Sequence, residues 1–320
     1  MKKILRILSM LALSLVVFAA CSVEGEDKKV ESSTKESTST VSSEKETKAN
    51  AKDFTVGVSI STLNNPFFIS LKEGIESKAK EEGLNVVISD AQNDSSTQSN
   101  QIEDLITQKV DLIIVNPVDS TAVSPSVTAA NDANIPIICV DRGSDEGEVL
   151  SFISSDNVEG GKMAGKYILE QIKENDKVAQ LEGIPGASST RERGQGFEEA
   201  TKGKIDLVAS QTANFDRAEG LTVMENMIQA NPDIKAVFCQ NDEMALGAAE
   251  ALAGNKNDVI IVGFDGNEDA IAAVKEGKLA ATVAQKPDEM GKIAIETALK
   301  HLQGEKVDKE IASPLELITK

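Results

Sequence analysis

Polar side chains follow directly on short apolar runs at several places in this 320-residue sequence. They are carboxylates, amides and a guanidinium, namely Asp90, Asn116, Asp141, Arg142, Asn241, Asp242, Asp265 and Gln285. Such a set suits a neutral polyhydroxylated ligand, because each hydroxyl donates one hydrogen bond and accepts up to two. Any single Asn or Asp of the set is better explained as a helix N-cap. Arg142 and Gln285 are poor caps, so they favour a shared polar binding cleft.

Three of the nine Phe residues lie beside polar residues of this kind. Phe67 and Phe68 follow Asn65, and Phe215 follows another Asn. Their flat faces would pack against the C–H side of a sugar ring. The alternative is core packing at a helix start, since Asn65 before a proline is ordinary N-terminal helix chemistry.

The elements that must position these side chains alternate between apolar runs and amphipathic segments. The apolar runs predict strands at 54–60, 85–90, 111–115, 135–140, 177–181, 205–210, 235–239, 258–264 and 279–284. The amphipathic segments predict helices at 67–82, 95–108, 121–132, 157–174, 191–200, 216–230, 242–253, 266–276 and 287–302. Several strands are apolar throughout, so helices must cover both faces of parallel sheets. This many strands favours two doubly wound α/β domains, which bind ligands at the carboxyl ends of their strands.

The N-terminal region differs in composition from the rest of the chain. Residues 1–21 begin with basic residues and continue with a largely apolar run of 14 residues, which is typical of a secretion signal and too short to span a membrane. The run ends in a sequence that resembles a bacterial lipobox, although Phe18 stands where Leu is usual. We therefore expect lipidation of Cys21, with an ordinary cleaved signal as the alternative. Residues 22–52 hold eleven Ser or Thr and no aromatic residue, which predicts a disordered tether.

Composition excludes several kinds of function. The formal net charge is −19, which argues against a nucleic-acid partner. The chain has one His, no Trp and three Cys without a CxxC spacing, so we expect no metal and no cofactor. The glycine-containing loop at 183–186 lacks the spacing of a phosphate-binding loop.

Eight motifs occur in order across residues 53–320, and together they resemble the ribose-binding proteins of bacterial ABC transporters. They are STLNNPFF at 61–68, NPVDS at 116–120, VDR at 140–142, RERG at 191–194, NFDR at 214–217, QNDEMALG at 240–247, GFDG at 263–266 and AQ at 284–285. The resemblance implies a type 1 periplasmic binding protein, in which two doubly wound parallel-sheet lobes are joined by a three-stranded hinge. Lobe one would comprise 53–155 plus 286–314, and lobe two 156–285 plus 315–320.

The resemblance also implies a set of sugar contacts. Carried over position by position, they are Asn65, Phe67, Phe68, Asn116, Asp141, Arg142, Arg193, Phe215, Asn241, Asp265 and Gln285. We expect Arg142 and Arg193 to keep the buried carboxylates ionised. Galactose and glucose binders of the same superfamily usually stack the sugar on a Trp, and this chain has none.

By this resemblance, the chain is a substrate-binding lipoprotein that captures D-ribose between its lobes and passes it unchanged to an ABC permease. It would be exported, held by a lipid anchor on the outer face of the cytoplasmic membrane, monomeric and not an enzyme. One alternative is a binder of allose or of a related pentose or hexose. A second alternative is a glycoside hydrolase that uses Asp141 and Asp265 as its carboxylate pair. A third is the core of a lac-repressor-type regulator, but such regulators carry a helix-turn-helix where this chain has a secretion signal and tether.

Overall fold

The computed structural model describes residues 50–254 and 258–320. The expected signal segment, Cys21 and most of the expected tether lie outside these residues. The first described element is a 3-10 helix, η1 (Ala51–Asp53), which is capped by Asn50 and buries Ala51. Residues 50–52, at the end of the expected tether, are therefore part of the folded region. Within the two described ranges, no helix is long and apolar enough to cross a membrane.

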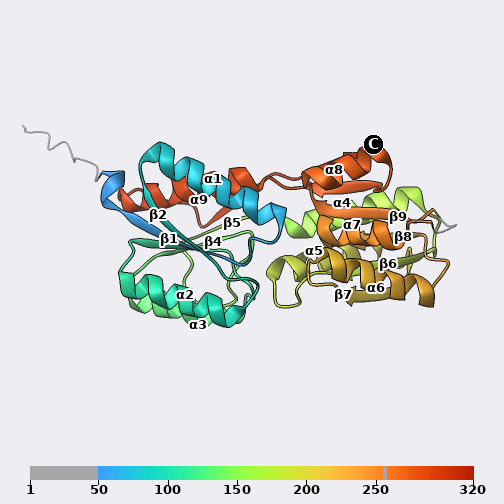
Figure 1. Cartoon of the computed structure of the whole chain (residues 1–320), viewed down its shortest axis with the longest axis horizontal. Helices are drawn as coiled ribbons and strands as arrows, with labels where there is room; N and C mark the ends of the chain where they lie inside the picture. Colours follow the sequence, from blue (N-terminus) through green and yellow to red (C-terminus); the bar gives the residue numbers. More distant parts are fainter. Residues whose placement is uncertain (1–49, 255–257) are drawn as a thin grey trace, which may run out of the picture. The chain divides into compact units, whose positions relative to one another are not determined.

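Two six-stranded sheets form the framework of the fold (Figure 1). The first has the order β11-β5-β4-β3-β1-β2 and is parallel throughout. Its strands are β1 (Thr55–Ile60), β2 (Asn85–Asp90), β3 (Leu112–Val115), β4 (Ile137–Val140), β5 (Ser151–Ser155) and β11 (Glu310–Ser313). Buried side chains occupy every position of β3 and β4, as expected of strands covered on both faces.

The second sheet has the order β12-β10-β9-β8-β6-β7, and only the β10–β12 pair is antiparallel among its described strands. Its strands are β6 (Lys177–Glu182), β7 (Asp206–Thr212), β8 (Ala236–Cys239), β9 (Ile260–Asp265), β10 (Ala281–Ala284) and β12 (Glu316–Thr319). A six-stranded sheet with covering helices in each half confirms the expected pair of doubly wound α/β lobes.

Helices cover both faces of each sheet. In the first lobe, α1 (Pro66–Glu82) and α9 (Pro287–Leu302) pack on one face, and α2 (Ser95–Gln108) and α3 (Ser124–Asp132) on the other. In the second lobe, one face carries α4 and α5 and the other carries α6, α7 and α8. These helices are α4 (Asn157–Gln171), α5 (Ser188–Thr201), α6 (Arg217–Ala230), α7 (Asp242–Ala251) and α8 (Glu268–Glu276).

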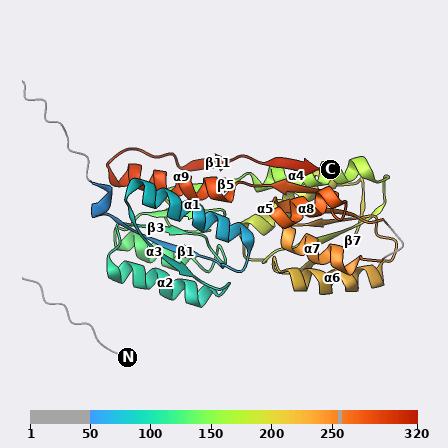
Figure 2. The same cartoon turned by 45° about the horizontal axis from the view of Figure 1, so that its top comes forward.

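The chain passes between the two lobes at three points. It leaves the first sheet after β5, returns after β10 and leaves again after β11 to end in β12. Figure 2 shows β11 running beside β5, with which it pairs in parallel, before the chain continues to its C terminus. These three crossing segments form the connection between the lobes, as expected for a three-stranded hinge.

Three strands were not predicted from the sequence: β5, β11 and β12. Buried and half-buried residues alternate along β5, and most residues of β11 and β12 are exposed or half-buried. These segments therefore lack a continuous apolar run, and pairing with a neighbouring strand determines their conformation.

The helix that carries Arg193, α5, packs on the hydrophobic core of the second lobe. Phe197 of α5 stacks on Phe238 of β8 with their ring centroids 5.0 Å apart, and both rings are almost fully buried. Since Phe197 follows Arg193 by one helical turn, this contact fixes the height of Arg193 above the sheet.

Phe238→Ala should lower the free energy of unfolding by about 3–5 kcal/mol, because it leaves a cavity beneath α5. Urea denaturation followed by circular dichroism measures the change. Leu207→Ala on β7 is the matched control: its side chain is 45% exposed, so we expect a much smaller loss. Equal losses in the two variants would contradict the described packing.

Candidate ligand-binding site

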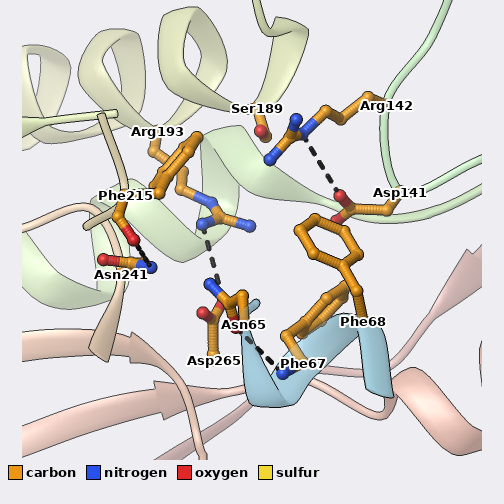
Figure 3. A pocket seen from close by; sticks show the side chains of 10 residues that line it. All are labelled: Asn65, Phe67, Phe68, Asp141, Arg142, Ser189, Arg193, Phe215, Asn241 and Asp265. Carbon is orange, nitrogen blue, oxygen red and sulfur yellow. Dashed lines mark hydrogen bonds and ion pairs between the residues drawn. The ribbon is translucent and has the colours of Figure 1, made fainter. Parts of the chain in front are cut away.

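A cavity lies between the two lobes, beside the carboxyl ends of strands from both sheets (Figure 3). It is lined by Asn65, Phe67, Phe68, Asp141, Arg142, Ser189, Arg193, Phe215, Asn241 and Asp265. Nine of these ten are residues expected from the sequence. The expected residues Asn116 and Gln285 are buried nearby but do not line the cavity, and Ser189 was not expected.

The start of α1 supplies Asn65, Phe67 and Phe68. The Asn65 side chain caps the helix, because its Oδ1 accepts a hydrogen bond of 2.9 Å from the Phe67 backbone N–H. The capping interpretation is therefore correct, and the same residue also lines the cavity. The Phe67 and Phe68 rings meet edge to face with centroids 5.1 Å apart, so they form one rigid apolar wall.

Asp141 follows β4 and has a positive φ of 65°, a conformation that turns its side chain away from the strand direction. Its Oδ2 accepts a 3.3 Å hydrogen bond from Asn116 Nδ2 and lies 3.5 Å from Arg142 Nε. Its Oδ1 is buried and has no hydrogen-bond partner among the described residues. One carboxylate oxygen is thus held in place by protein groups, and the other is not.

Asn116 positions Asp141 from behind the cavity. Its Nδ2 donates to Val140 O and to Asp141, and its Oδ1 accepts from the Ser61 backbone N–H. Both ends of this buried amide therefore make hydrogen bonds within the lobe. These bonds link the carboxyl ends of β1, β3 and β4.

Arg142 lies between aromatic rings of the two lobes. Its guanidinium carbon is 5.1 Å from the centroid of Phe68 and 5.2 Å from that of Phe215, both within cation–π range. Nη1 donates to Pro117 O at 3.2 Å. The side chain thus bridges the two apolar walls while its remaining N–H groups stay available.

Arg193 is fixed on three sides. Its Nε donates to Asn157 Oδ1 at 2.9 Å, and its Nη1 donates to Gln240 O at 2.7 Å. The guanidinium carbon also lies 3.8 Å from the Phe264 ring centroid, and Nη1 is 3.6 Å from Asp265 Oδ1. A guanidinium held in this way presents its charge to the cavity without losing side-chain entropy on binding.

Asp265 ends β9 and also has a positive φ, of 125°. Its Oδ1 accepts a 2.9 Å hydrogen bond from Gln285 Nε2, which explains why Gln285 lies behind the cavity wall. Asn241 caps α7 through the Met244 N–H and donates to Phe215 O at 3.2 Å, so each end of its amide makes one hydrogen bond within the lobe.

Sequence reasoning missed Ser189 and Asn157. Ser189 precedes Arg193 by four residues on α5, so helical spacing from an expected site residue would have placed it on the same face. Asn157 is the first residue of α4, and only its contact with Arg193 Nε shows its role. Among the described residues, no cluster of His, Cys, Asp or Glu is arranged to hold a metal ion.

Burial and the neighbouring arginines have opposite effects on the pKa values of the two cavity carboxylates. Burial raises the pKa of Asp141, and the charges of Arg142 and Arg193 offset this only in part. Burial likewise raises the pKa of Asp265 well above its ordinary value, against the opposing effect of Arg193. The arginines act in the expected direction, since they favour the charged carboxylates, but burial has the larger effect on both pKa values because removal from water disfavours the charged form.

Direct contacts join the lobes beside the cavity. Ser120 N–H donates to Gly186 O at 2.9 Å, and Ser120 Oγ accepts from Ser188 N–H at 3.1 Å. Asp145 and Arg191 form an ion pair of 2.8 Å across the same boundary. The described arrangement is therefore a closed one, in which both lobes contribute to one enclosed site.

Comparison with known proteins identifies the family. The family described as "Periplasmic binding protein domain" matches residues 56–306, so the chain belongs to that family. The chain is 49% identical over 319 residues to the ribose import binding protein of Bacillus subtilis, covering 100% of this chain and 99% of that protein.

Solved structures show the same fold. An ABC transporter solute binding protein from Bacillus halodurans with bound myo-inositol superposes with a TM-score of 0.79 at 35% identity, covering 83% of this chain and 94% of that one. One from Actinobacillus succinogenes with bound D-allose gives a TM-score of 0.77 at 34% identity, covering 83% and 98%. These relatives are solute-binding proteins of transporters, which are not enzymes.

Asn116→Ala should lower the free energy of unfolding of the ligand-free protein by about 1–3 kcal/mol, because it leaves the buried Ser61 N–H without a partner and removes the hydrogen bonds to Val140 O and Asp141 Oδ2. Chemical denaturation measures this. Ser189→Ala is the matched control, since Ser189 lines the cavity but no hydrogen bond of its hydroxyl is described, so its stability should change little. An Asn116 variant as stable as the control would refute the positioning role.

Proposed function

We propose that this chain is the substrate-binding subunit of an ABC sugar importer, and that it binds D-ribose in the cavity between its lobes. The observation that carries the proposal is the unpartnered, buried Asp141 Oδ1 in a cavity with two arginines and three Phe rings. An acceptor left without a partner in such a place is satisfied by a ligand hydroxyl. The full-length similarity to a ribose import binding protein supports the choice of sugar.

The cavity chemistry fits an uncharged monosaccharide. Asp141 and Asp265 would accept hydrogen bonds from sugar hydroxyls, and Arg142 and Arg193 would donate to the sugar oxygens. Phe67, Phe68 and Phe215 would cover the apolar ring faces. The proposed direct contacts are Asn65, Phe67, Phe68, Asp141, Arg142, Arg193, Phe215, Asn241 and Asp265, with Asn116 and Gln285 acting through the two carboxylates.

The similar proteins leave more than one monosaccharide as a candidate ligand. Allose and other close monosaccharides remain the alternative ligands, because solved relatives at 34–35% identity contain allose and myo-inositol. Higher identity to the ribose import protein, at 49%, favours ribose among them.

Lobe closure would couple binding to transport. Only the closed form brings residues of both lobes onto one ligand, so the sugar stabilises closure through contacts that the open form cannot make. The closed, loaded form would then dock on the membrane permease and release the sugar without any chemical step. We further propose export, a lipid anchor at Cys21 with residues 22–49 as the tether, and action as a monomer.

Asp141→Ala should weaken D-ribose binding at least tenfold, because removing one side of a buried charge-assisted hydrogen bond costs about 2–5 kcal/mol. Isothermal titration calorimetry measures the affinity. Asp90→Ala is the matched control: this Asp also ends a strand, but it does not line the cavity, so its affinity should equal that of the unmodified protein. An unchanged isotherm for the Asp141 variant would remove this residue from the site.

Ribose affinity should fall as the pH is lowered from about 8 to about 4. The ionised carboxylates accept hydroxyl hydrogens, and protonation removes that capacity, so binding is complete above their pKa values and is lost below them. Because burial raises the pKa of Asp141 and of Asp265, the fall should begin at a higher pH than for an exposed Asp of pKa about 3.9. Calorimetry across this range tests it, with circular dichroism to verify folding. A flat profile down to about pH 4 would contradict the proposed role of the carboxylates.

A further inference from the structure

Gly183 lies directly behind the Phe215 wall of the cavity. It follows β6, and a Cβ atom built at this position would be 2.0 Å from Phe215 Cζ and 2.2 Å from its Cε1. Real Cβ contacts are essentially never shorter than 3.0 Å. The backbone of Gly183 does not adopt the positive φ that favours glycine, so the ring contact alone excludes a side chain here.

The Phe215 ring separates Gly183 from the cavity. Phe215 lines the cavity and Gly183 does not. The guanidinium carbons of Arg142 and Arg193 lie 5.2 Å and 5.9 Å from the ring centroid, and Figure 3 shows Phe215 beside Arg193. A ring displaced from Gly183 therefore moves toward the arginines and into the space for the ligand.

Hydrogen bonds prevent either backbone from moving back. Gly183 N–H donates to Gln240 Oε1 at 3.0 Å, and Gly183 O accepts from Thr212 Oγ1 at 2.7 Å. The Phe215 carbonyl accepts from Asn241 Nδ2 at 3.2 Å, and Phe215 itself has a positive φ of 61°. Since hydrogen bonds fix both backbone segments, a side chain added at position 183 would displace the Phe215 ring.

We propose that Gly183 is a positioning residue that sets the depth of the Phe215 wall, and through it the size of monosaccharide that the cavity accepts. This inference rests on the proposed function, since it assigns a determinant of ligand size to the same site. Gly183 would not touch the ligand itself. Because it has no side chain, the Phe215 ring can occupy the space beside its Cα atom.

The test measures D-ribose and D-allose affinities of Gly183→Ala by calorimetry. We expect ribose affinity to fall at least about tenfold and allose affinity to fall further, because the larger sugar tolerates a narrowed cavity less well. Gly203→Ala is the matched control: it has a positive φ of 72° and nothing within 4 Å of a built Cβ, so it should lower the melting temperature without changing either affinity.

A double variant tests whether the effect passes through the ring. In a Phe215→Leu background the smaller side chain leaves room for a Cβ, so adding Gly183→Ala should change ribose affinity less than about twofold. An equal loss in both backgrounds, or wild-type affinity for Gly183→Ala alone, would overturn the inference.

The crystal structure of Gly183→Ala separates this inference from the proposed function. The Phe215 ring should be displaced toward Arg142 whether or not ribose binds, and an unmoved ring would overturn the positioning role. Failure of the unmodified protein to bind ribose would instead overturn the choice of ligand.

Discussion

Two carboxylates buried in one small cavity are the constraint on which the site depends. Asp141 and Asp265 are almost fully removed from water, and burial raises the pKa of each despite neighbouring arginines. Removing a charge from water is unfavourable unless hydrogen bonds replace the lost solvation. In the closed form, Asp265 accepts a hydrogen bond from Gln285, and Asp141 Oδ2 accepts one from Asn116. Asp141 Oδ1, however, has no partner among the described residues. In the proposed function, a ligand rich in hydroxyls donates the hydrogen bond that this oxygen lacks.

The scaffold holds these groups in conformations that an isolated chain would avoid. Asp141, Phe215 and Asp265 all have positive φ, which is strained for residues with side chains. The strain is tolerated because each residue lies next to a rigid element: Asp141 and Asp265 at the ends of buried strands, and Phe215 just before α6. The same placement turns their side chains into the space between the lobes. Precise positioning of a few polar groups thus follows from the two parallel sheets.

The sequence was most informative where one local signal determined structure. Continuous apolar runs identified strands such as β4 and β9, and the carboxylates at their ends, Asp141 and Asp265, line the cavity. It was least informative where structure depends on distant pairing, as in β5, β11 and β12. It also did not show that both amide ends of Asn116 are used inside its own lobe, because that depends on where three strands converge. The effect of burial on the two carboxyl pKa values was not visible in the sequence for a related reason, since burial is a property of the closed fold and not of the residues beside an Asp.

The central claim is that the sugar completes the hydrogen bonding of buried carboxylates that closure has desolvated. A crystal structure with D-ribose tests it most directly. The account predicts a ribose hydroxyl oxygen within about 3.0 Å of Asp141 Oδ1, with the three Phe rings against the sugar. A ribose bound elsewhere, or one in this cavity that leaves that oxygen without a partner, would contradict it.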